Sequence, residues 1–255
     1  MIHLETIKAI TLPEFTASGV PAAPPPRERA GRSSAEINSG ALLVFGAALT
    51  SQMSSDISNS VLFSQLAADA QFSRFVKPTE WVKRYLEVMS QIGWIQTSFD
   101  ARTPVSVPAP AEWVPIVTQI LRSGQALAQA GITGAQALAQ ASAPMKIWNG
   151  NAFSGDHGLM MLVPAQLASG SIRADFGLTV FEFDHEIDQF LSWSLAYQIT
   201  QLSSTQELDE EVYARVRETI IEKLGNRPRY LVADVPLKLE ELAPCQPQRS
   251  CQSIP

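Results

Sequence analysis

The sequence predicts an α+β fold, in which an N-terminal helical layer packs on an antiparallel sheet and a C-terminal helix closes the structure. Helical spacing of apolar residues dominates roughly the first half of the chain, strand-like runs fill residues 159–202, and an amphipathic helix follows at 209–224. Helices that precede strands, without alternation, favour α+β over a βαβ nucleotide fold. No Gly-rich phosphate loop follows a predicted strand.

A single domain is predicted over residues 33–240. It follows a flexible Pro-rich arm at residues 1–32, where Pro21, Pro24, Pro25 and Pro26 lack amide donors and favour extended geometry. A strand-like piece, His3 to Leu12, is expected to dock on the domain. Residues 241–255 are expected to be a disordered tail. This tail holds both cysteines, Cys245 and Cys251, so the domain itself has no disulfide or thiol chemistry.

The first half is expected to form helices over residues 33–49, 56–72, 78–92, 112–130 and 133–141, with a strand at 94–99. Ser33 and Glu36 have the spacing of a capping box, which predicts a helix start. Trp81, Tyr85 and Met89 form one apolar stripe at helical spacing. The repeated segments 125–130 and 136–141 (QALAQA) predict two Ala-rich helices that pack closely.

The second half is expected to form strands over residues 159–167, 172–183, 190–202 and 230–239, which we assign to an antiparallel meander with aromatic cross-strand pairs. The last helix, 209–224, is expected to begin at Asp209 as N-cap and to end at Gly225. Its buried stripe is predicted to be Val212, Val216, Ile220 and Leu224.

Composition excludes some classes of protein. A net charge of −6 and a pI near 5.1 argue against a dedicated nucleic-acid binder, which would present a basic face. The longest apolar run, residues 41–49, is far shorter than the 18 or more residues of a membrane span. Residues 1–12 lack the features of a secretory signal. We expect synthesis in the cytoplasm, and peripheral membrane association is compatible with these features.

Two polar turns contain candidate chemistry. His157 follows Asp156 in a Gly-flanked turn, and Asp184, His185 and Asp188 lie in a second turn between two predicted strands. Each turn could supply an acid–base pair or metal ligands. A solvated turn is the more common reading, because Asp, Gly and His favour turns. A metal would need ligands from both turns, and neither turn has zinc-finger spacing, so no metal site, cofactor or catalytic residue is assigned.

Cations and aromatic residues alternate near the third predicted helix. The cluster consists of Arg74, Phe75, Lys77, Trp81, Lys83 and Arg84. Cations beside aromatic rings suit an anionic membrane surface, where each charge contributes about 1 kcal/mol. The alternative is an ordinary helix surface whose aromatic stripe faces the core. On either reading, replacing the four cations by Gln is expected to alter folding very little.

Residues 43–99 and 211–225 resemble the Erwinia virulence factor (Evf) family. The resemblance rests on residues 51–69 (SQMSSDISNSVLFSQLAAD), 81–94 (WVKRYLEVMSQIGW) and 211–225 (EVYARVRETIIEKLG). It implies an α+β domain of unusual topology with no established reaction, in a family where lipid acylation of a cysteine and association with anionic membranes are known. This chain has no cysteine before Cys245, so the acylated position matches no residue here.

The leading functional hypothesis is therefore a non-enzymatic lipid- or membrane-associating protein, similar to a virulence factor, with a lipid or an anionic membrane surface as its partner. The alternative is a small accessory enzyme or binding protein that acts on an apolar metabolite, with the turn at 184–188 at the mouth of its pocket. A third reading is an interaction protein that uses its Pro-rich arm. The sequence gives no indication of oligomeric state.

Overall fold

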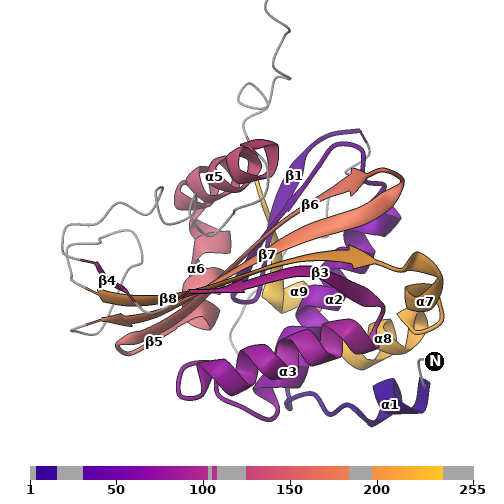
Figure 1. Cartoon of the computed structure of the whole chain (residues 1–255), viewed down its shortest axis with the longest axis horizontal. Helices are drawn as coiled ribbons and strands as arrows, with labels where there is room; N and C mark the ends of the chain where they lie inside the picture. Colours follow the sequence, from indigo (N-terminus) through magenta and orange to yellow (C-terminus); the bar gives the residue numbers. More distant parts are fainter. Residues whose placement is uncertain (1–3, 16–30, 103–104, 108–124, 184–196, 238–255) are drawn as a thin grey trace, which may run out of the picture.

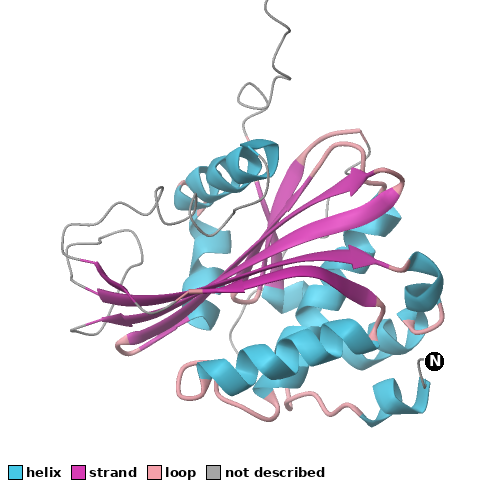
Figure 2. Cartoon of the chain, viewed as in Figure 1, coloured by secondary structure: helices cyan, strands magenta, loops and turns pink. Residues whose placement is uncertain are grey.

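A computed structural model describes residues 4–15, 31–102, 105–107, 125–183 and 197–237 of the 255-residue chain. These residues form one mixed sheet with helices on both faces, as Figures 1 and 2 show, and the α+β class is confirmed. The strands are β1 (Ser34–Asn38), β2 (Ala41–Phe45), β3 (Trp94–Ala101), β4 (Val105–Val107), β5 (Phe153–Ser154), β6 (His157–Ala168), β7 (Ser171–Phe183), β8 (Tyr197–Leu208) and β9 (Val232–Val235). The helices are α1 (Leu4–Ala9), α2 (Ser51–Asp69), α3 (Pro78–Gln91), α5 (Gln125–Ala139), α6 (Ser142–Ala152), α7 (Glu210–Ala214), α8 (Arg217–Leu224) and α9 (Pro228–Leu231).

The strand order is β3-β8-β7-β6-β2-β1-β9, with β4 beside β8 and β5 beside β6. Neighbouring strands run antiparallel, as predicted, except that β2 and β6 are parallel. Helices α2, α3 and α8 cover one face of the sheet, and α5 and α6 cover the other. The sheet therefore lies between two helical layers rather than under one.

Residues 33–49 form the hairpin of β1 and β2, so the helix predicted there is wrong. The turn is made by Ser39, whose φ of 54° is unusual for a residue with a side chain, and by Gly40. Alternate residues of β2 enter the two separate cores: Leu43 packs under α2, whereas Leu42 and Val44 pack under α5 and α6. A strand buried on both faces is apolar throughout, which makes its sequence hard to distinguish from a buried helix.

Other helix predictions shift in position. Helix α2 begins at Ser51, five residues before the predicted start, because the Thr50 hydroxyl accepts a hydrogen bond from the Met53 amide. The first QALAQA repeat and the first four residues of the second lie in one continuous helix, α5, instead of two packed helices. Helix α6 was not predicted, and residues 112–124 lie outside the described residues. The predicted helix at 78–92 and strand at 94–99 are confirmed as α3 and β3.

The predicted strands at 159–167 and 172–183 are confirmed as β6 and β7. The third strand, β8, extends to Leu208, six residues beyond the predicted end. Residues 230–239 were predicted to be one strand, but α9 occupies their beginning and β9 starts at Val232.

The last helix is divided into α7 and α8. Asp209 caps α7 as predicted, with its Oδ1 accepting the Val212 amide at 3.0 Å, and Gly225 ends α8 with a φ of 55°. Val216, Ile220 and Leu224 are buried as predicted. Because of the break, Val212 is only partly buried, and Tyr213 enters the core nearby.

Residues 4–15 belong to the folded body. The segment predicted to be strand-like contains helix α1, which buries Ile7 and is followed by the buried Ile10. Lys223 Nζ donates to the Ile10 carbonyl at 2.8 Å, and Arg227 donates to the Pro13 carbonyl at 2.6 Å. The arm predicted at 1–32 therefore starts too early, and residues 16–30 lie outside the described residues. Across the described chain, no helix is long and apolar enough to cross a membrane.

Candidate functional site

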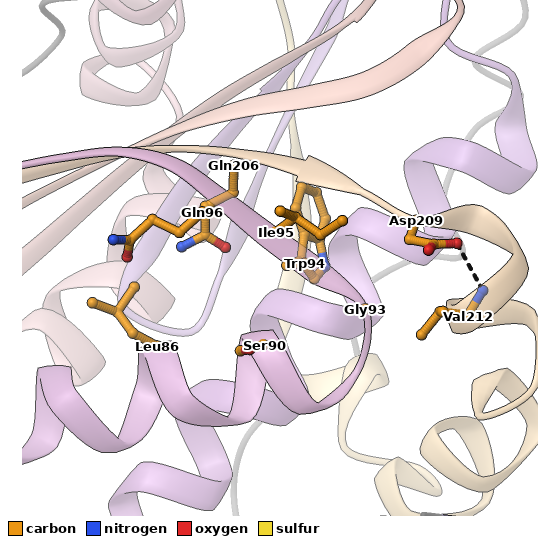
Figure 3. A pocket seen from close by; sticks show the side chains of 9 residues that line it. All are labelled: Leu86, Ser90, Gly93, Trp94, Ile95, Gln96, Gln206, Asp209 and Val212. Carbon is orange, nitrogen blue, oxygen red and sulfur yellow. Dashed lines mark hydrogen bonds between the residues drawn. The ribbon is translucent and has the colours of Figure 1, made fainter. Parts of the chain in front are cut away.

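A pocket of about 460 Å³ lies where the end of α3 turns into edge strand β3. Figure 3 shows that it runs along β3 from Leu86 on one side to Asp209 on the other. The lining residues come from α3, the α3–β3 turn, β3, the end of β8 and the start of α7: Leu86, Ser90, Gly93, Trp94, Ile95, Gln96, Gln206, Asp209 and Val212. We call it the α3–β3 pocket.

The shape of the α3–β3 pocket depends on Gly93. Its φ of 104° is a conformation that residues with side chains rarely adopt. A Cβ at this position would lie 2.9 Å from Val212 Cγ1 and 3.2 Å from the Asp209 carbonyl oxygen. The Asp209 amide donates to the Gly93 carbonyl at 2.9 Å. Close backbone approach at Gly93 thus fixes α7 against the turn that forms one end of the pocket.

The strand register determines which side chains face α3. Trp94 pairs with Leu208, and Gln96 pairs with Gln206 on the same face of the sheet. Figure 3 shows the two Gln amides extending side by side toward α3, where Leu86 and Ser90 lie. Leu86 and Ser90 are four residues apart, so they occupy one face of the helix. The pocket therefore has apolar walls and a row of amide groups.

Two of the lining side chains each have a buried polar atom without a hydrogen-bond partner among the described residues: Trp94 Nε1 and Gln206 Oε1. Both side chains are only 2% exposed. The Gln206 amide nitrogen has a long contact with Ser204 Oγ at 3.4 Å. Leaving a buried donor or acceptor unpaired costs about 1–3 kcal/mol, so such groups in a native fold need an explanation. Trp94 thus has an unused donor and Gln206 an unused acceptor, on two side chains that line the same pocket.

The charge of the pocket restricts its ligand. Asp209 is the one ionisable group among the described lining residues, and one of its oxygens caps α7. None of these described residues carries a positive charge. A carboxylate or phosphate would therefore meet a negative charge without a compensating cation. The described lining residues include no His or Cys.

The structure separates the predicted basic–aromatic cluster into internal and surface residues. Arg74 is 5% exposed and Trp81 is fully buried. Arg74 donates through Nε to Asp69 Oδ1 at 2.9 Å and through Nη2 to the other Asp69 oxygen, while Trp81 Nε1 donates to Asp69 Oδ1 at 2.7 Å. The Arg74 guanidinium also lies 4.9 Å from the Trp81 ring centroid. These two residues form an internal network and cannot contact a membrane surface.

The other members of the cluster lie nearer the surface. Lys77 and Lys83 are exposed, and Phe75 is partly buried. Arg84 is mostly buried and pairs with Glu87 at 2.9 Å. Between Phe75 and Lys77, Val76 is 77% exposed, more than any other large apolar side chain described. Val76 was not predicted as part of the cluster, although it lies between an aromatic residue and a cation in the sequence.

Of the two predicted polar turns, only the first lies within the described residues. His157 Nδ1 lies 2.6 Å from Asp156 Oδ1, and both side chains are exposed. The hydrogen bond with His157 lowers the pKa of Asp156 below its ordinary value of 3.8. Asp184, His185 and Asp188 lie outside the described residues. Where the chain is described, no three His, Cys, Asp or Glu side chains come together in a way that could hold a metal ion.

The pocket residues Trp94, Gln206 and Asp209 were not predicted as a site. Trp94 and Asp209 were recognised only as a strand start and a helix cap. Gln206 has a signal that sequence reasoning can detect: it alternates with Leu208 on the buried face of β8, where an amide is unusual. Knowing which face is buried, however, requires the register of β3 against β8.

Comparison with known proteins gives distant similarity to solved structures. No family model matches the chain, and no curated protein sequence matches it. The solved structure described as "Structure of the Evf virulence factor" is similar with a TM-score of 0.37 and 10% sequence identity, over 86% of this chain and 88% of that chain. This is a resemblance at the level of the fold, and we transfer neither residues nor function from it.

Proposed function

We propose that this chain is a non-enzymatic binding protein, and that the α3–β3 pocket holds a small, uncharged, lipid-like molecule. The observation that carries the proposal is that two side chains lining one pocket, Trp94 and Gln206, each have a buried polar atom without a partner, Nε1 and Oε1. The indole can only donate, and the amide oxygen can only accept. A ligand head group must therefore accept from Trp94 and donate to Gln206, as a primary amide or an alcohol does.

The remainder of the ligand is expected to be apolar. Leu86, Ile95 and Val212 line the pocket beside the Trp94 indole. A volume of about 460 Å³ accommodates about fifteen non-hydrogen atoms at roughly 30 Å³ each. This suits a short acyl chain or a single ring system with one polar head. Asp209 disfavours an anionic head, which distinguishes this ligand class from a free fatty acid.

The test is calorimetric titration of the full chain with octanamide and with octanoate at pH 7. Octanamide is expected to bind more tightly, because only its head group is uncharged and both donates and accepts. Asp209→Asn is expected to reduce the difference in affinity between octanamide and octanoate, since Asn still caps a helix but has no charge.

Gln206→Leu is the matched test of the head-group contact. Losing one hydrogen bond of about 0.5–1.5 kcal/mol should weaken octanamide binding about three- to tenfold. Gln198, which is exposed on the same strand, provides the control substitution Gln198→Leu. Equal affinity for octanoate and octanamide, or equal weakening by the two Leu variants, would contradict the proposal.

A second candidate function is contact with an anionic membrane through the loop before α3. It is favoured by the 77% exposure of Val76 next to Lys77. Two exposed cations, Lys77 and Lys83, would contribute about 2 kcal/mol together at an anionic surface. Co-sedimentation with phosphatidylcholine vesicles, with and without phosphatidylglycerol, tests this function. Lys77→Gln/Lys83→Gln should weaken binding to the anionic vesicles; equal binding to both vesicle types would exclude an electrostatic contact.

A further inference from the structure

The edge of the sheet beside the α3–β3 pocket is open. Strand β3 lies at one end of the strand order, and among the described residues it pairs with β8 alone. Every residue of β3 from Ile95 to Phe99 is exposed. Ile95 and Phe99, at 56% and 49%, are two of the five large apolar side chains exposed among the described residues. An edge strand of this kind can accept a further strand.

The register identifies the backbone groups of β3 that face outward. The Asp209 amide donates to the Gly93 carbonyl at 2.9 Å, so these residues form a hydrogen-bonded pair that continues the ladder of β3 and β8. Such pairs alternate along an antiparallel ladder, so Ile95 also bonds to β8, whereas the amides and carbonyls of Trp94 and Gln96 point away from it. The open edge thus presents backbone donors and acceptors beside the pocket that Trp94 and Gln96 line.

Helix α3 forms a second wall beside this edge. Leu86 and Ser90 line the pocket together with Gln96, and Figure 3 shows β3 running alongside α3 with these side chains between them. Ser90 and Gln96 are exposed, so the pocket opens to solvent between helix and strand. We call the pocket and the open edge together the β3 groove. A sheet edge with an adjoining pocket suits an extended peptide, because backbone hydrogen bonds hold the peptide and the pocket selects among alternate side chains.

The charge of the β3 groove favours a basic partner at one end. Asp209 lines the pocket, and Glu210 and Glu211 follow it at the start of α7. Within the described part of the chain, none of these three carboxylates forms an ion pair. The cations of α3, Lys83 and Arg84, precede the pocket residues of that helix. The groove is therefore negative at its α7 end, which is complementary to a lysine or arginine.

We propose that the β3 groove binds a short extended peptide, which pairs with β3 as an added antiparallel strand and places basic residues beside Asp209, Glu210 and Glu211. Antiparallel pairing is the more common kind, and it puts the C-terminal end of the peptide where β3 begins. The pairing of β3 with β8 shifts by one residue between Gln96 and Ser98, and this bulge limits the regular edge to a few residues. A short peptide therefore fits better than a long strand of a second copy of this chain.

This partner goes beyond the small ligand proposed above, because it is held by backbone groups of the strand edge. The test is an NMR titration of the full chain with the peptide acetyl-TVTVTKK-amide, in which apolar and polar side chains alternate before two lysines. Saturable shifts are expected at the backbone amides of β3. The acidic peptide acetyl-TVTVTEE-amide should bind about tenfold more weakly, because its carboxylates meet the negative end of the groove.

N-methylated peptides test the strand pairing without altering the protein. Two versions of the basic peptide carry N-methyl groups on opposite sets of alternate amides. One version should lose binding and the other should keep it, because only every second amide of an added strand faces β3. Equal binding of the two versions would show that the peptide does not pair as a strand.

Gln96→Pro and Gln96→Ala form a matched pair of variants. Both shorten the side chain, but only proline removes the outward-facing amide, at an edge position where proline is tolerated. Gln96→Pro should weaken the peptide about tenfold more than Gln96→Ala does. Gln206→Leu, which should weaken octanamide, is expected to leave peptide binding unchanged, so the two proposals fail or succeed separately.

Hydrogen exchange tests whether the edge is open before the peptide binds. In the free chain the Gln96 amide should exchange faster than the Ile95 amide, because only Ile95 donates to β8. The peptide should slow exchange at Gln96. A Gln96 amide that is already protected in the free chain, through a second copy or any other cover, would overturn the proposal. Absence of saturable shifts with acetyl-TVTVTKK-amide would overturn it as well.

Discussion

Asp56 on α2 and Arg217 on α8 form a two-pronged ion pair across 161 residues of sequence. Arg217 donates through Nε to Oδ1 at 2.9 Å and through Nη2 to Oδ2 at 2.7 Å. Asp56 is 1% exposed, and it also accepts a hydrogen bond from Gln52 Nε2 at 2.9 Å. The pair joins the long polar helix of the first half to the C-terminal helix that closes this layer.

Removing Arg217 should therefore destabilise the fold. Arg217→Met leaves a buried carboxylate without its cation, and we expect a loss of about 3 kcal/mol in the free energy of unfolding. Arg215→Met, at an exposed position two residues earlier, should stay within about 0.5 kcal/mol of the parent. Urea denaturation measures both. A similar small effect of both variants would show that the ion pair contributes little.

Substitutions of Arg74 and Lys77 should likewise differ in their effect on the stability of the fold. Arg74 holds Asp69 and also donates to Gln65 Oε1 at 3.3 Å and to the Asn151 carbonyl at 3.1 Å. Arg74→Gln should cost about 3–5 kcal/mol, because Asp69 then loses its cation. Lys77→Gln should have almost no effect on folding. The expectation from sequence that all four cations could be replaced without loss is thus wrong for Arg74. Thermal unfolding of the two single variants tests the difference.

The buried stripe of α8 offers a pair of adjacent isoleucines. Ile220 is fully buried, whereas Ile221 is 42% exposed. Ile220→Ala should cost about 2–5 kcal/mol through lost burial and the cavity left behind. Ile221→Ala has the same change of side chain and should cost far less. Denaturant unfolding of the two variants would contradict the assignment of the stripe if their midpoints were equal.

The Asp156–His157 contact predicts that the stability of the fold depends on pH in the acidic range, through the pKa of Asp156. The pKa of Asp156 is lowered by its hydrogen bond with His157. The unfolded state therefore binds a proton at higher pH than the folded state does. The stabilisation is complete above the ordinary pKa of 3.8 and is lost as pH falls through the lower folded pKa. Carboxyl-carbon NMR should show the Asp156 midpoint rising toward 3.8 in His157→Ala. An unchanged midpoint would mean that the imidazole does not cause the shift.

Much of the fold could be predicted where one face of an element is apolar and the other polar. The α3 stripe, the Asp209 cap and the Gly225 stop follow from side-chain chemistry over a few neighbouring residues. The β1–β2 hairpin could not be predicted in this way, because β2 is buried on both faces and lacks alternation. Helix α1 was misassigned because a six-residue helix gives only weak periodicity.

The candidate sites were less predictable because they depend on strand register. Gln206 and Trp94 come together only when β3 pairs with β8. The basic cluster was misleading for a related reason. Sequence spacing places Arg74 beside Lys77, but the fold brings Asp69, Gln65 and Asn151 around Arg74 and leaves Lys77 at the surface.

The proposed pocket is tested most directly by the indole N–H resonance of Trp94 during titration with octanamide. Trp81 and Trp148 provide internal controls, because their Nε1 groups already donate to Asp69 at 2.7 Å and to the Gly40 carbonyl at 3.1 Å. We predict that the Trp94 resonance alone of these three moves downfield, in proportion to occupancy, and that Gln206→Leu shifts its midpoint to higher octanamide concentration. A Trp94 resonance that stays in place while octanamide saturates the protein would contradict the proposed site.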